Sequence, residues 1–155
     1  MNFFVILGLK WAAIPLLPSI ALFFLLRRRS STAERRHLGK IGVGFGFFGL
    51  LVFSAFLKKP SIGDLVLLML PYPVGSFLAV WEWGWRGIIV PLIFSVSALA
   101  IAFSIEPASG YFGYAPQIFF SMSVLVQGLV GAGAALIGNR LCSQRQVEGA
   151  GATSA

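Results

Sequence analysis

Acidic residues and the side chains that most often perform catalysis are scarce in this chain. Its 155 residues include five Asp and Glu, one histidine and one cysteine. Acid and base chemistry needs such groups gathered in one pocket, whereas here they are scattered over separate polar stretches between apolar blocks. One cysteine, Cys142, excludes an intrachain disulfide and a paired-cysteine redox or zinc motif. We therefore expect a protein that is not an enzyme and has no cofactor or metal.

Charge of either sign is also rare, whereas apolar residues are abundant. Charged residues make up 11% of the chain and hydrophobic residues 57%, and the mean hydropathy is +0.87. With so few polar residues, the chain could not cover the hydrophobic core of a soluble protein. We therefore expect it to be surrounded by lipid. The net charge of +7 comes mostly from cations that flank apolar blocks. This pattern is typical of contact with anionic lipid headgroups and does not favour nucleic acid as a partner.

Apolar blocks of nearly membrane-spanning length follow one another along the chain. A helix needs about 20 residues to cross roughly 30 Å of hydrocarbon. The blocks cover residues 3–26, 41–57, 65–80, 88–105 and 118–138. The sequence thus predicts an all-α, polytopic membrane bundle of about five transmembrane helices. Residues 1–139 would form this single domain, and residues 140–155 a short cytoplasmic tail that ends in small polar residues, which we expect to be disordered.

A basic stretch between the first two blocks predicts the orientation of the bundle. It carries a single acidic residue, Glu34, and the cations Arg27, Arg28, Arg29, Arg35, Arg36 and Lys40. Because cytoplasmic loops are enriched in Lys and Arg, this stretch is expected inside, with the N-terminus outside and the C-terminus inside. Four spans, with the first block lying in the interface, form the alternative. The cation bias and short loops suggest a multi-pass protein of a bacterial inner membrane.

The third block contains the most irregular sequence, PYPVG at residues 71–75. Pro71 and Pro73 each remove a backbone donor and obstruct the preceding turn, so we expect a kinked or broken span. The segment WEWGW at residues 81–85 follows it directly. Its three indoles are expected to lie at headgroup depth as an aromatic anchor.

Small residues recur at helical spacing in the second and fifth blocks. Gly42 and Gly46 are four residues apart, as are Gly131 and Ala135, and Gly128 lies one turn before Gly131. Small faces of this kind let helices approach closely in lipid, where no hydrophobic drive brings them together. We expect these five residues to pack against other helices, including those of a partner.

Gln127 is the most buried polar residue that the sequence places inside any block. An amide in hydrocarbon needs a hydrogen-bond partner on another helix or a wet cavity. With the backbone around Pro71 and Pro73, it could line a polar path. This feature keeps a passive channel, or a subunit of a membrane transporter complex, as the alternative function.

A chain with these properties is expected to act through the packing of its helices. We expect a non-enzymatic membrane protein that binds a membrane-inserting partner through helix–helix contacts. In size and hydropathy the chain is similar to small polytopic bacterial immunity proteins. That similarity implies neutralisation of a pore-forming toxin as one example of such a function, with membrane lipid and the toxin as partners.

Overall fold

The computed structural model describes the backbone of residues 3–28, 37–56, 69–105 and 115–152, and side chains within 15–27, 37–52, 69–104, 118 and 120–143. All regular structure in these ranges is helical, as the sequence predicts. The helices are α1 (Phe3–Arg28), α3 (Leu38–Phe56), α5 (Pro71–Trp83), the 3-10 helix η1 (Gly84–Ile88), α6 (Ile89–Ile105) and α7 (Ala115–Ala152).

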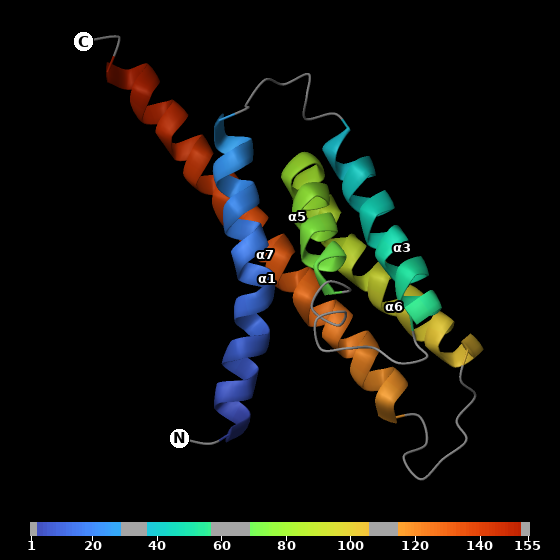
Figure 1. Ribbon diagram of the computed structural model, residues 1–155. Helices are drawn as coiled ribbons and strands as arrows, with labels where there is room; N and C mark the ends of the chain where they lie inside the picture. The colour runs from blue at the N-terminus through green and yellow to red at the C-terminus, as the bar shows by residue number, and fades with distance from the viewer. Residues whose placement is uncertain (1–2, 29–36, 57–68, 106–114, 153–155) are drawn as a thin grey trace.

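The short helix α5 lies at the centre of the bundle (Figure 1). It contacts α1, α3, α6 and α7, and ten of its 13 residues are buried. Helices α1, α5 and α7 run in one direction, and α3 and α6 run in the other, so the two termini lie at opposite ends (Figure 1). Thirteen helical residues rise about 20 Å, so α5 is too short to cross a bilayer by itself.

The predicted interruption of the third block lies at Leu70, where α5 begins. Met69 is helical, Leu70 is a turn residue, and Pro71 and Pro73 occupy the first turn of α5. A proline costs little there, because the first N–H groups of a helix have no partner within it. The two prolines therefore start a helix about two-thirds of the length of a span, and the earlier part of this block lies outside the described residues.

Gly84 ends α5 and allows the chain to reverse into α6. Its φ of 59° lies in the left-handed region that a side chain disfavours, and its N–H bonds to the carbonyl of Val80. Trp81, in the last turn before this cap, is buried in the core with 3% exposure, whereas Trp85 is 71% exposed. Trp81 therefore packs inside the bundle, where it stacks on Phe77, and does not face the surroundings as Trp85 does.

Two helical stretches are long and apolar enough to cross a membrane, residues Pro71–Ser104 and Phe120–Ser143. The first joins α5, η1 and α6, which fold back on one another at η1 (Figure 1). These stretches are compatible with a membrane protein. The second belongs to α7, which continues as a helix to Ala152, so the predicted tail begins as part of this helix. Residues 153–155, at the end that was expected to be disordered, lie outside the described residues. The tail contains no proline, and its Arg, Leu, Gln and Ala residues are good helix formers.

Candidate functional site

The small residues singled out in the sequence pack helices of the chain itself. A Cβ atom on Gly42 would lie 2.7 Å from the carbonyl oxygen of Gly75, so α3 and α5 touch through their backbones. Gly46 packs against the ring of Phe94 on α6, and Gly131 against the backbone of Pro73. These glycines are covered inside the bundle, so a binding surface for another molecule has to be sought elsewhere.

Gly128 and Ala135 complete this internal packing along α7. A Cβ atom on Gly128 would lie 2.9 Å from the side chain of Pro91 and 3.0 Å from the hydroxyl of Ser76. Ala135 is fully buried in the cluster around Phe77. One face of α7 therefore packs against both α5 and α6.

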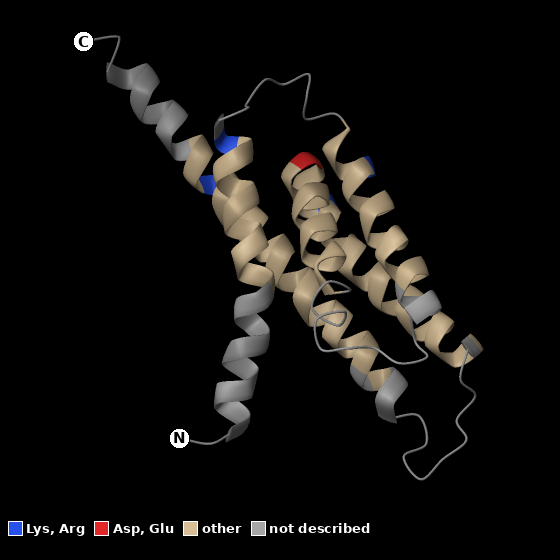
Figure 2. Ribbon diagram, viewed as in Figure 1, with Lys and Arg blue, Asp and Glu red and all other residues tan. Residues whose placement is uncertain are grey.

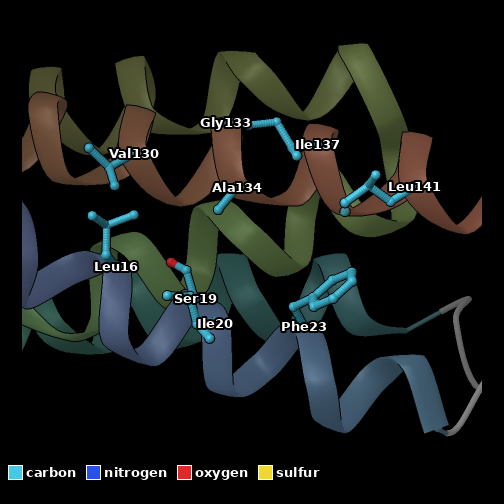
Figure 3. Close-up of a pocket in the computed structure, with 10 residues that line it drawn as sticks. Leu16, Ser19, Ile20, Phe23, Val130, Gly133, Ala134, Ile137 and Leu141 are labelled. Carbon is cyan, nitrogen blue, oxygen red and sulfur yellow. The ribbon is translucent and has the colours of Figure 1, made fainter.

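A groove of about 400 Å³ opens between α1 and a different face of α7 (Figure 3). It is lined almost entirely by apolar side chains, and its two walls come from the two helices. The α1 wall is Leu16, Ser19, Ile20 and Phe23, and the α7 wall is Val130, Gly133, Ala134, Ile137, Gly138 and Leu141. Ser19 adds no free polar group, because its hydroxyl donates to the carbonyl of Pro15 at 2.8 Å.

The groove is closed at one end and open along the middle. A Cβ atom on Gly138 would lie 2.7 Å from the ring of Phe23, so α1 and α7 are in direct contact there. At Gly133, five residues earlier, no atom lies within 4 Å of such a Cβ. Leu16 and Ile137 are 41% and 63% exposed beside this open part. The groove can therefore accept apolar atoms from another molecule without a change in the packing of the bundle.

Arginine side chains stand near the closed end of the groove. Leu16, Ile20, Phe23 and Arg27 follow one another three or four residues apart, so Arg27 continues the same stripe of α1. Arg140 lies three residues after Ile137 on α7. Both arginines are exposed. The apolar groove thus leads toward positive charge.

The basic residues that the structure describes gather in one half of the bundle (Figure 2). Lys40 lies in the first turn of α3 and Arg86 in η1, and both are exposed like Arg27 and Arg140. The side chain of Arg28 lies outside the described residues, as do Arg29, Arg35 and Arg36 entirely. Among the side chains that the structure describes, positive charge therefore gathers at the end of the bundle where α1 finishes and α3 begins, which we call the basic end (Figure 2).

Gln127 belongs to a second feature, three buried polar side chains on the neighbouring helices α5 and α7, which we call the polar cluster. Gln127 is 2% exposed, and Tyr72 and Ser76 on α5 are fully buried. The side-chain polar atoms of all three have no hydrogen-bond partner among the described residues. Pro71 and Pro73 are buried in the same part of α5.

Two other buried polar side chains, Ser95 and Ser121, do have hydrogen-bond partners. Their hydroxyls bond to each other at 2.8 Å and each donates to the other's carbonyl, which joins α6 to α7.

Glu82 has a structural role that sequence reasoning missed. Its carboxylate accepts a hydrogen bond of 2.5 Å from the N–H of Gly39, in the first turn of α3. Gly39 and Glu82 are 43 residues apart in the sequence, so this hydrogen bond belongs to no local capping motif. The only hint in the sequence was a lone acidic residue between two tryptophans.

The described side chains offer packing and hydrogen bonding but no grouped catalytic residues. No three of their His, Cys, Asp and Glu residues come close enough together to hold a metal ion. The groove and the polar cluster are therefore the features that bear on function. No protein-family model, curated protein or solved structure matches this chain.

Proposed function

We propose that the chain is a non-enzymatic, multi-pass integral membrane protein that binds an apolar helix of a membrane-inserted partner in the groove between α1 and α7. The observation that carries the proposal is the open middle of this groove at Gly133. A small-residue wall lets another helix backbone approach closely, and close approach is the main source of helix affinity in lipid.

Membrane insertion is supported by the outer faces of the bundle, which are apolar. Leu17, Phe48, Leu51 and Val96 are each at least 60% exposed, and they lie on three different helices. A monomer in water rarely exposes large apolar patches, whereas lipid covers them at no cost. Exposure of this kind on several sides favours lipid as the surrounding rather than a single protein interface.

The orientation that we propose places the N-terminus outside and the C-terminus inside, with five crossings of a bacterial inner membrane. The basic end of the bundle supports this, because cations are enriched on the cytoplasmic side. The chain returns from the end of α3 to η1 at the opposite end (Figure 1). We take this return of the chain as the third crossing, although α5 alone is shorter than a full crossing.

Labelling of single cysteines in spheroplasts tests this orientation. In a Cys142→Ser background, Ser104→Cys at the end of α6 should react with a membrane-impermeant maleimide in sealed spheroplasts. His37→Cys, before α3, should react only after permeabilisation, because it lies at the basic end. Both positions are exposed, so access should be decided by the membrane. Reaction of both from the same side would contradict the proposed crossings.

The partner helix should carry an acidic side chain near its cytoplasmic end. Arg27 and Arg140 lie near the closed end of the groove, and a carboxylate on a bound helix could pair with them. Such a helix is the kind of segment that a pore-forming toxin inserts. Binding it here would keep it from assembling with its own copies, which is how the chain would act as an immunity protein.

Photocrosslinking in the native membrane tests the groove. A benzoyl-phenylalanine at Ile137 should give discrete protein adducts, whereas the same probe at Val96 on α6 should give lipid adducts. The two sites are matched, being 63% and 66% exposed. Gly133→Leu should abolish the protein adducts because leucine fills the open part of the groove. Gly44→Leu is the control, since Gly44 also has no atom within 4 Å of its Cβ position.

Two outcomes would count against the groove as a partner site. Lipid adducts alone at Ile137 would show that the groove holds acyl chains. Protein adducts that persist in Gly133→Leu would place the partner elsewhere on the bundle.

A passive channel is less well supported by the arrangement of the core. On α5, Ser76 lies between Tyr72 of one apolar cluster and Phe77 of the other. On α7, Gln127 lies in the same way between Val124 and Ala132. A channel needs a continuous polar lining, whereas these polar groups occupy the junction between two apolar clusters.

A further inference from the structure

The polar cluster between α5 and α7 presents hydrogen-bonding groups that the protein itself does not satisfy. The hydroxyls of Tyr72 and Ser76 and both amide atoms of Gln127 have no partner among the described residues. All three side chains are at least 98% buried. More than nine in ten buried polar groups in proteins have a partner, so a group of four such atoms calls for an explanation.

These residues lie in one part of the bundle. Tyr72 and Ser76 are one turn apart on α5 and therefore share a face. The hydroxyl of Ser76 lies 3.0 Å from the Cβ position of Gly128, the residue next to Gln127. Tyr72 also packs in the same apolar cluster as Val124, one turn before Gln127.

A proline also removes one backbone hydrogen-bond donor at the start of α5. The carbonyl of Met69 would normally receive a hydrogen bond from the N–H four residues later, and that residue is Pro73, which has none. Met69, Tyr72 and Ser76 are spaced three and four residues apart, so this carbonyl belongs to the turn that precedes Tyr72. In membrane helices, ordered water is one of the means by which such freed carbonyls are satisfied.

We propose that Tyr72, Ser76 and Gln127 hold water in a closed site where α5 begins. The cluster combines donors and acceptors and carries no charge, so it suits a neutral ligand and not an ion, which would lack a counter-charge. The close contact of Ser76 and Pro91 with Gly128 limits the ligand to a small one. Buried water typically makes about three hydrogen bonds to groups of this kind.

Radiolytic labelling of the full chain in liposomes tests the site, because X-rays convert bound water to hydroxyl radicals in place. Mass spectrometry should find oxidation of Tyr72 well above that of Phe77, which is equally buried but lies in the other cluster. Gln127→Leu should remove the excess oxidation at Tyr72. Oxidation of Tyr72 no greater than that of Phe77 in the wild-type chain would overturn the proposal.

Thermal unfolding gives a second, independent readout. With water present, Gln127→Leu should lower Tm by a few degrees, because Ser76 and Tyr72 lose the water that the amide helps to hold. An increase in Tm would mean that the site is dry, since leucine would then remove unsatisfied atoms. If Gln127→Leu does not fold, Ser76→Ala can replace it in both experiments. It should also lower the oxidation of Tyr72 and the Tm. Unchanged oxidation of Tyr72 or an increase in Tm would overturn the proposal.

Discussion

Gly131→Leu should lower the Tm of the bundle by about 6–12 °C, as expected for a loss of about 3 kcal/mol in a chain of this length. A Cβ atom at this position would collide with the carbonyl oxygen of Pro73 and lie 2.8 Å from its Cα and carbonyl carbon. Because these are backbone atoms, no rotamer change can relieve the contact. Helix α5 would have to move away from α7, which would open the centre of the bundle.

The matched control is Gly133→Leu, two residues later on the same helix. It introduces the same side chain where no atom lies within 4 Å, so its Tm should stay close to that of the wild-type chain. Reaction of the single native cysteine, Cys142, with a thiol-reactive fluorophore can report unfolding, because this residue is only partly exposed. Equal Tm values for Gly131→Leu and the wild-type chain would contradict the described packing of α5 on α7.

Glu82→Ala should destabilise the protein by roughly 1.5–3 kcal/mol, the usual contribution of a hydrogen bond to a charged group. The carboxylate accepts from Gly39 in the first turn of α3, where N–H groups lack partners within the helix. It also places negative charge at the positive end of the helix dipole. Alanine would remove both effects and leave the first turn of α3 without its link to α5.

Comparison with Glu82→Gln separates these two effects, because glutamine keeps an oxygen acceptor but loses the charge. We expect its Tm to fall between those of the wild-type chain and Glu82→Ala. Arg86→Ala, a change at an exposed charged residue one turn later, should alter stability by less than about 0.5 kcal/mol. A wild-type Tm for Glu82→Ala would show that Glu82 does not stabilise α3.

Much of the helical layout could be predicted from the sequence, because apolar runs bounded by charge or proline are strong local signals. The blocks at 41–57 and 88–105 agree closely with α3 and α6. The third block was less predictable, since its prolines could have kinked one helix or started a new one. The structure shows a new helix beginning at Pro71.

The candidate site was much less predictable, because hydropathy does not tell which face of an apolar helix meets which neighbour. Gly131 and Gly133 look alike in the sequence, yet the first packs against a backbone and the second opens into the groove. What each glycine contacts depends on the positions of α1 and α5, which are far from α7 along the chain. The sequence showed that Gln127 needed a partner, but its neighbours Tyr72 and Ser76 lie about 50 residues away on α5.

The central position of α5 also bears on how the protein is made. A ribosome synthesises α1, α3, α5 and α6 before α7, the helix that carries Gln127, Gly128 and Gly131. Until α7 emerges, one side of α5, including the buried hydroxyls of Tyr72 and Ser76, has no protein to cover it. The short helix α5 therefore stays incompletely packed at first, and the core of the bundle is completed only after α7 has been synthesised.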